Sequence, residues 1–246
     1  MGLAVLGVLI LAAGCAWGGV EITPPGELSV MRVARTRVPI VPDGEVSAAE
    51  WGGAEVGRLS MDVFHPERPV RQGTVVRALR DDRYLYVAFE CEDTDVWGTM
   101  MERDAPVYVE EAVEIFIDPE GRYRNYYEID AGPAGGTTDL LLVSNRLLGG
   151  PKNVAYDVSG LRVGVRVNGT VGYRSDRDAG WSAEFAIPWS EFRHRSVNVP
   201  PQPGDRWRVN FYRIDRPTAG EDEYTAWSRS VGAFHEPRNF GVLEFR

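Results

Sequence analysis

Apolar residues recur at every second position in several short stretches of this chain, and this alternation restricts the fold more than any other feature. In the stretch 85–92, one set of alternate residues is apolar and the other contains both glutamates. A period of two places the two sets on opposite faces of a β-strand. The same pattern recurs in 113–118, 181–187 and 207–211. The residues expected to face the core are Leu85, Val87, Phe89, Cys91, Val113, Ile115, Ile117, Trp181, Ala183, Phe185, Ile187, Trp207, Val209 and Phe211.

Helix signals are few and turn signals are many. Ser47 followed by Glu50 predicts a capped turn of helix before Trp51, and 190–192 predicts another short turn. Asn168-Gly169 predicts a tight hairpin between 161–167 and 170–173. Many short strands separated by polar turns are typical of two packed sheets. The sequence therefore predicts an all-β protein: one antiparallel β-sandwich domain of the jelly-roll or immunoglobulin-like type, spanning 40–246.

The charge balance and the cysteines exclude several classes of protein. The 246 residues include 27 Lys+Arg and 36 Asp+Glu, a net charge of −9, so the chain would repel nucleic acid. The only cysteines, Cys15 and Cys91, cannot form a disulfide framework. Cys91 shares the apolar face of its strand, which indicates a buried structural thiol and not a nucleophile. We expect a monomer.

The first residues have the pattern of a targeting segment. The apolar run from Leu3 to Ala13 would span about 16 Å as a helix, too short to cross a bilayer, and predicts a signal peptide. The stretch 11–15, Leu-Ala-Ala-Gly-Cys, resembles a bacterial lipobox. We therefore expect export, with 1–14 removed, Cys15 lipidated, and 15–39 serving as a tether. Membrane contact would be through the lipid only. The alternative is a plain signal peptide cut near Ala16 or Gly18.

Motifs for catalysis are missing, but carboxylates are abundant. The three histidines lack metal-ligand spacing, and no nucleophile-elbow, Walker or Rossmann pattern occurs. Glycosidases use a pair of carboxyl groups about 5–9.5 Å apart. Glu114 could form such a pair with Glu128 or with Glu184. The other interpretation is that these carboxylates are solvated or paired with arginines.

Five aromatic residues lie in or beside turn-like segments: Trp97, Tyr108, Tyr126, Trp227 and Phe234. Aromatic faces next to polar groups suit sugars, whose rings offer apolar C–H faces surrounded by hydroxyls. Each ring could equally pack in the core. Composition and pattern alone therefore leave sugar binding as one possibility among several.

Six blocks of the sequence, in order, resemble family 9 carbohydrate-binding modules. The most recognisable block is Tyr108-Val109-Glu110-Glu111-Ala112-Val113-Glu114-Ile115-Phe116-Ile117-Asp118. The others are Asp43-Gly44-Glu45 with Trp51, and then 79–87, 180–189, 204–211 and 234–241. Together they cover nearly all of 40–246. The resemblance implies a β-sandwich that binds the end of a sugar chain without catalysis and supports polysaccharide utilisation.

The resemblance also implies a site. Tyr108 and Phe234 match the two rings that clamp the sugar, where tryptophan is usual in the family. Glu114 matches the acidic ligand-contacting position, and Glu128 stands where an arginine is expected. We expect Tyr108 and Phe234 to face each other across a shallow slot, with an exposed Glu114 on its floor and His235 at its rim. The resemblance also implies structural calcium, which the carboxylate-rich loops of this chain could bind, although the sequence does not assign its ligands.

Three classes of function remain open at this point. The first is non-catalytic binding of an oligo- or polysaccharide at Tyr108, Glu114, Phe234 and His235. The second is a sandwich that binds protein or acts as a scaffold on an exported lipoprotein. The third is an enzyme that acts on glycans.

Overall fold

The computed structural model describes residues 28–143, 152–153 and 156–246. The expected signal peptide and Cys15 lie outside the described residues. Within the described part, no helix is long and apolar enough to cross a membrane. The strands are β1 (Val30–Arg35), β2 (Glu55–Leu59), β3 (Met61–Asp62), β4 (Thr74–Arg80), β5 (Tyr84–Cys91), β6 (Ala112–Asp118), β7 (Tyr126–Ala131), β8 (Thr137–Leu142), β9 (Lys152–Asn153), β10 (Arg162–Asn168), β11 (Gly180–Pro188), β12 (Arg206–Asp215), β13 (Glu223–Ala226) and β14 (Gly241–Phe245). The helical turns are α1 (Ala48–Trp51), η1 (Val107–Val109), η3 (Trp189–Phe192) and η4 (Pro237–Asn239).

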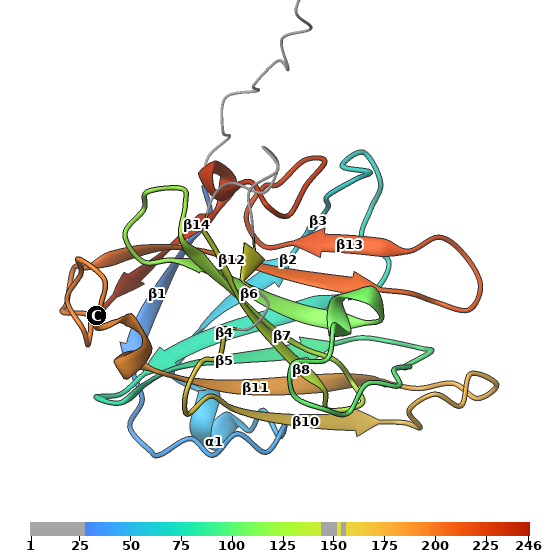
Figure 1. Cartoon of the computed structure of the whole chain (residues 1–246). Coiled ribbons are helices and arrows are strands. Elements are labelled where there is room, and N and C mark those ends of the chain that lie inside the picture. The colour runs from blue at the N-terminus through green and yellow to red at the C-terminus, as the bar shows by residue number, and fades with distance from the viewer. Residues whose placement is uncertain (1–27, 144–151, 154–155) are drawn as a thin grey trace, which may run out of the picture.

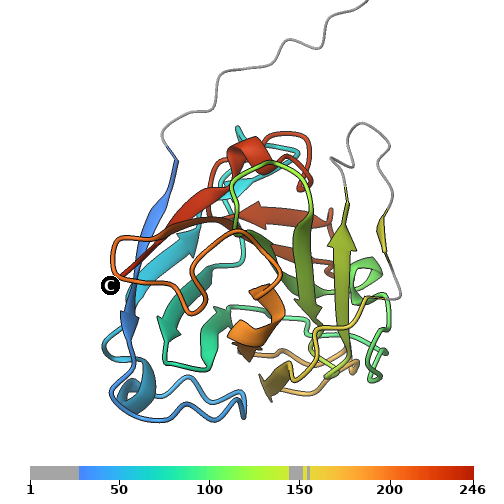
Figure 2. The same ribbon diagram turned by 60° about the vertical axis from the view of Figure 1, so that its left-hand side comes forward.

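The strands form two layers joined along one side. Their order is β10-β11-β5-β4-β1-β14-β12-β6-β7-β8-β9, with β2 beside β4 and β13 between β12 and β3. In Figure 1, β12, β13 and β14 lie above β4, β5, β11 and β10, and α1 lies below the lower layer. Figure 2 shows the strands curving around a common centre, so that the sheet is nearly closed. The all-β prediction is confirmed.

The sheet is mixed, which corrects the expectation of purely antiparallel strands. β1 pairs in parallel with β14 and with β4, and thereby joins the two layers. This strand lies within the segment 15–39, which was expected to be a tether. Met31 and Val33 are buried and alternate with more exposed residues. Because β1 is paired within the sheet, the domain begins before residue 40.

The core between the layers follows the alternation in the sequence. The ring of Phe89 on β5 contacts the rings of Phe185 on β11 and Phe211 on β12, with centroids 6.0 and 5.8 Å apart. All fourteen residues predicted to face the core are buried in one apolar cluster. Cys91 is among them, and burial raises the pKa of its thiol to about 12, which agrees with a structural role.

The outer faces of both layers are partly covered. α1 packs Trp51 against the outer face of the lower layer, over Tyr86 and Ala88. The predicted cap is confirmed, because the Ser47 hydroxyl accepts a bond from the backbone N–H of Glu50. On the upper layer, the segments around 63 and 226–240 cover Phe116, Tyr126 and Tyr212 and form a second apolar cluster.

The tight hairpin predicted at Asn168-Gly169 does not form. β10 continues to Asn168 and pairs with Gly180 at the start of β11, so residues 169–179 form a longer loop. The Asp178 carboxylate holds this loop by accepting the backbone N–H groups of Thr170 and Val96, each at 2.8 Å. Asp178 therefore replaces the short turn with side chain-to-backbone bonds that the dipeptide pattern did not reveal.

Candidate functional site

A pocket opens on the outer face of the upper layer, above β6, β7 and β12. It encloses about 360 Å³, within the ~300–1,000 Å³ typical of small-ligand sites. The residues that line it are Phe64, Tyr108, Glu114, Glu128, Ile214, Arg216, Tyr224, Gly232, Ala233, Phe234 and His235. Aromatic rings and carboxyl groups dominate this lining.

One wall of the pocket is a group of contacting rings. Phe234 stacks on the buried Tyr212, with centroids 4.2 Å apart and an interplanar angle of 11°. Phe64 lies 6.4 Å from Phe234, nearly parallel to it, and meets Tyr224 edge-on at 5.0 Å. Because Tyr212 supports it from behind, Phe234 is held in place before any ligand arrives. Phe64 is 47% exposed, so its ring offers free apolar surface.

Tyr108 also lines the pocket and is held by the short turn η1. Its neighbour Val107 is buried, and the backbone N–H of Val107 donates to the Thr138 hydroxyl at 3.1 Å. The next residue, Val109, is 51% exposed. This turn leaves Tyr108 half-buried between a fixed anchor and the solvent, where its ring can contact a ligand.

Two glutamates of adjacent strands lie at the pocket. Phe116 on β6 pairs with Glu128 on β7, which makes Glu114 and Glu128 diagonal neighbours on one face. Both side chains are buried, with exposures of 2% and 3%. Burial, and secondly the charge of Glu128, hold the pKa of Glu114 well above its usual range, while Arg216 opposes the shift. The neutral form of the Glu114 carboxyl group is therefore favoured relative to an exposed glutamate.

The structure corrects one property predicted for Glu114. The alternation placed its side chain on the outer face of its strand, and that face is the right one. We expected the side chain to be exposed there, but loops cover this face and Glu114 is buried at the base of the pocket.

His235 and Arg216 add polar groups to the pocket. The Tyr126 hydroxyl lies 2.9 Å from Nδ1 of His235, and Nε2 of His235 lies 3.8 Å from Oε2 of Glu128. Arg216 forms an ion pair with Asp222 and donates to the Glu110 carbonyl oxygen at 3.1 Å. Arg216 is thus held by several partners at the edge of the pocket.

All four residues predicted for the site line this one pocket: Tyr108, Glu114, Phe234 and His235. Sequence reasoning missed Phe64, Tyr224 and Arg216. Phe64 stands directly before His65-Pro66, so the criterion of an aromatic residue beside a turn would have selected it.

The other candidates lie elsewhere. Tyr126 is fully buried, Trp227 is nearly so, and Trp97 packs beneath the Arg174 guanidinium. None of these three lines the pocket. Glu184 lies on the outer face of the lower layer, where it accepts a bond from Nε1 of Trp51 at 2.7 Å. It also accepts the backbone N–H groups of Asp43 and Gly44. Glu184 is therefore a structural anchor, and the pair Glu114–Glu184 is not a catalytic pair.

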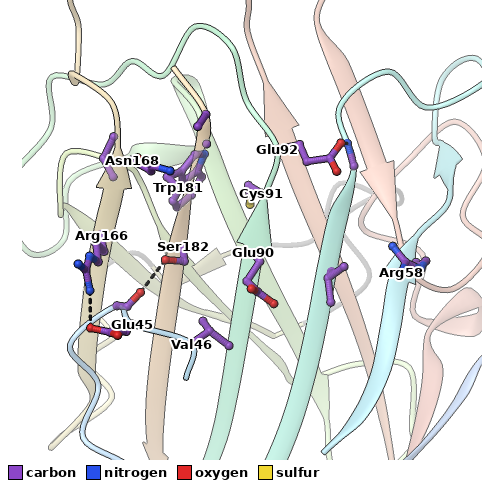
Figure 3. A pocket seen from close by; sticks show the side chains of 16 residues that line it. Glu45, Val46, Arg58, Glu90, Cys91, Glu92, Arg166, Asn168, Trp181 and Ser182 are labelled. Carbon is purple, nitrogen blue, oxygen red and sulfur yellow. Dashed lines mark hydrogen bonds and ion pairs between the residues drawn. The ribbon is translucent and has the colours of Figure 1, made fainter. Parts of the chain in front are cut away.

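A larger depression of about 710 Å³ lies over the lower layer (Figure 3). Its polar groups largely satisfy one another: Arg166 pairs with Glu45, and the Ser182 hydroxyl donates to the Gly44 carbonyl oxygen at 2.6 Å. Trp181, the only aromatic residue of the lining, is buried. Without an exposed ring, this surface is less suited to a sugar than the aromatic pocket.

A buried acidic cluster lies apart from both depressions. Oxygen atoms of Asp93, Glu111 and Asp215 lie within 4.8 Å of one another. Arg213 donates from Nη2 to Asp93 at 2.8 Å and to Asp215 at 3.4 Å. Oε1 of Glu111 is buried without a hydrogen-bond partner in the described structure. Burial, and then the charge of Asp93, raise the pKa of Glu111 to about 9.

Comparison with known proteins places this chain in a family. The family described as "Carbohydrate family 9 binding domain-like" matches residues 41–246. The chain belongs to this family. The match covers every residue of the aromatic pocket and of the acidic cluster, so the resemblance seen in the six sequence blocks is confirmed for the domain. No curated protein matches this family 9 domain at a significant level.

Solved structures share the fold of this family 9 domain. A candidate carbohydrate-binding protein from Bacteroides uniformis has a TM-score of 0.70 and 21% identity, over 89% of this chain and 100% of that one. A family 9 module from Caldicellulosiruptor kristjanssonii, in complex with cellotriose, has a TM-score of 0.60 and 16% identity over 89% and 94%. The same organism's module in complex with glucose has a TM-score of 0.61 and 17% identity over 87% and 95%. At these identities the likeness shows the fold alone.

Proposed function

We propose that this protein binds carbohydrate without catalysis, and that it takes the end of a sugar chain into the pocket of Tyr108, Glu114, Phe234 and His235. The observation that carries this proposal is the convergence of these residues, from distant parts of the sequence, on one pocket. The rings of Tyr108 and Phe234 would pack on the apolar face of a pyranose. The membership of a carbohydrate-binding family supports the same conclusion.

The base of the pocket supplies the polar contacts. Carboxyl oxygens of Glu114 and Glu128 can accept hydrogen bonds from sugar hydroxyls, and the neutral form of Glu114 could also donate one. The two buried carboxyl groups close the pocket below and favour entry of a terminal sugar over passage of a continuous chain. The related modules in complex with glucose and cellotriose make a neutral sugar a reasonable first ligand to test.

Glycan hydrolysis is the second candidate, because Glu114 and Glu128 share an aromatic pocket and the pKa of one of them is raised. We favour binding, since the family to which the chain belongs is defined by binding. Incubation with the bound sugar should release no reducing ends. Release that disappears in Glu114→Gln would favour hydrolysis instead.

Replacing Tyr108 with alanine should abolish measurable sugar binding, because it removes one side of the aromatic contact. A panel of cello-, xylo- and chito-oligosaccharides would first be screened by the rise in Tm that a ligand of the folded state produces. We expect affinities of about millimolar to micromolar, ~4–8 kcal/mol. Titration calorimetry would then compare the variants.

Tyr173→Ala is the matched control for this experiment. Tyr173 is 60% exposed in the loop 169–179 and lies outside the pocket lining. We expect it to bind as wild type does. Equal binding by Tyr108→Ala and Tyr173→Ala would contradict the proposed site. A screen in which no glycan binds would favour a protein-binding or scaffold role.

We also propose that the protein is exported and anchored through a lipid on Cys15, where it would serve polysaccharide utilisation. The apolar run before Cys15 and the lipobox-like stretch support this. Cells grown with labelled palmitate should yield labelled protein in the membrane fraction, and Cys15→Ser should lose the label. A soluble, unlabelled wild-type protein that begins near Ala16 would refute the lipid anchor and leave export intact.

Structural calcium is a further proposal, and the acidic cluster has the chemistry to hold it. Asp93, Glu111 and Asp215 offer oxygen ligands, the type that Ca²⁺ prefers. When all three are ionised, Arg213 balances one of their charges and leaves two, which a divalent cation would neutralise. Oε1 of Glu111, which has no hydrogen-bond partner in the described structure, would become a ligand of the ion. Bound calcium would tie the end of β5 to β6 and β12.

A further inference from the structure

The aromatic pocket has an acidic lining. Glu114 and Glu128 lie buried on neighbouring strands at its base. The cationic side chain among the lining residues is that of Arg216, whose charge is offset by its ion pair with Asp222. His235 lies against Glu128 through Nε2, 3.8 Å from Oε2. Two carboxyl groups would thus be available to a ligand, while the Arg216 guanidinium is paired with Asp222 at the edge of the pocket.

The rings around these carboxyl groups favour a positive charge as well. Tyr108, Phe64, Phe234 and Tyr224 line the same pocket. The face of an aromatic ring is electron-rich and attracts ammonium groups, more strongly where water is excluded. A neutral sugar gains apolar contact from the rings and hydrogen bonds from the carboxyl groups. A cationic sugar adds the attraction of its charge to both the rings and the carboxyl groups.

We propose that this pocket selects an amino sugar, a pyranose with a free protonated amine, over its neutral counterpart. This inference rests on the proposed sugar-binding function and specifies its ligand class. The ammonium group would lie at the base of the pocket against Glu114 and Glu128, with the pyranose ring between Tyr108 and Phe234. An ammonium offers three donors and no acceptor, which matches two carboxyl groups.

Binding of the amine is expected to change the protonation of the two carboxyl groups. Burial and the neighbouring Glu128 raise the pKa of Glu114 in the free protein. An ammonium group beside the pair would stabilise its ionised form, which lowers the pKa of Glu114 and sends any proton that the pair loses to solvent. Binding of the amino sugar should therefore release protons, whereas binding of a neutral sugar should not. Charge-assisted hydrogen bonds would supply the selectivity.

The test compares methyl glucosaminide, methyl glucoside and methyl N-acetylglucosaminide by titration calorimetry at mildly acidic pH, where the sugar amine is protonated before it binds. The glucosaminide should bind wild-type protein about tenfold or more tightly than the glucoside. The N-acetyl derivative should lose this advantage, because its amide carries no charge. Repeating the glucosaminide titration in buffers of different ionisation enthalpy measures the protons released.

Glu128→Gln keeps the shape of the side chain and removes one of the two carboxyl groups, so the ratio of the two affinities should fall several-fold toward one. Glu102→Gln is the matched control: it removes the same charge from an exposed position outside the pocket lining and should leave the ratio unchanged. If Glu128→Gln does not fold, the affinity ratio and the proton release measured on the wild-type protein still test whether the pocket prefers the amine.

The outcomes separate this inference from the proposed function. If the glucoside binds wild-type protein as tightly as the glucosaminide, selectivity for the amine is overturned and sugar binding stands. If the glucosaminide is preferred but Glu102→Gln reduces the preference as much as Glu128→Gln does, the pocket is not its source and the inference fails. If no sugar binds in a way that depends on Tyr108, both the inference and the proposed function fall.

Discussion

Phe211→Ala is expected to lower the free energy of unfolding by about 3–5 kcal/mol, because it removes a fully buried ring from a closely packed core. The ring contacts Phe89 of the lower layer and Trp227 beside it, at centroid distances of 5.8 and 5.3 Å. Its loss would leave a cavity between the layers. Urea unfolding, monitored by tryptophan fluorescence, measures the change.

Tyr173→Ala is the control for this measurement as well, since its ring is 60% exposed. We expect a change within about 0.5 kcal/mol for this surface position. If Phe211→Ala unfolds like Tyr173→Ala, then Phe211 does not lie between the layers. Such a result would place the register of β12 one residue away, which would turn every side chain of the strand to the other face.

Arg213→Leu should cost about 3–5 kcal/mol of stability, because it leaves Asp93 and Asp215 buried without their cation. The Arg213 side chain is 1% exposed, and it also donates to the Glu92 carbonyl oxygen at 2.7 Å. Unfolding would be measured in the presence of a chelator. The control Arg166→Leu removes an exposed ion pair with Glu45 and should cost about 1 kcal/mol or less. Equal losses for the two variants would contradict the buried role of Arg213.

The same variant tests the calcium proposal. Calcium should raise the Tm of the wild-type protein and recover part of the loss in Arg213→Leu, since it would balance the remaining carboxylates. Its effect should grow as the pH rises toward 9, because Ca²⁺ must displace the proton that Glu111 holds below its raised pKa. An unchanged Tm for both proteins at every pH would reject calcium at this cluster.

Local patterns in the sequence were sufficient to predict the core. Phe89, Phe185 and Phe211 were placed correctly because a period of two decides which face of a strand each residue occupies, whatever its partner strand. Pairing between distant strands is not encoded in this way. The parallel contacts of β1 with β14 and β4 depend on segments that are distant in the sequence meeting in space, and the alternation within 30–35 gives no sign of them.

The sequence predicted only part of the site, because local patterns do not show which distant segments cover a strand. The alternation gave the face of Glu114, but its burial depends on the segments around 63 and 226–240 that fold over that face. Phe64 stands beside a turn as the selected aromatic residues do, but it lies outside the six blocks that resemble the family, so the resemblance did not point to it. The cluster of Asp93, Glu111 and Asp215 joins three segments more than fifteen residues apart, so only the folded chain reveals it.

The structure of a complex with a bound sugar tests the central claim most directly. Crystals soaked with the tightest ligand from the oligosaccharide screen should show a pyranose ring between Tyr108 and Phe234, with a polar group of the sugar in hydrogen-bond contact with Glu114. A sugar bound instead in the depression of Arg166 and Ser182 over the lower layer, with the aromatic pocket empty, would contradict the account.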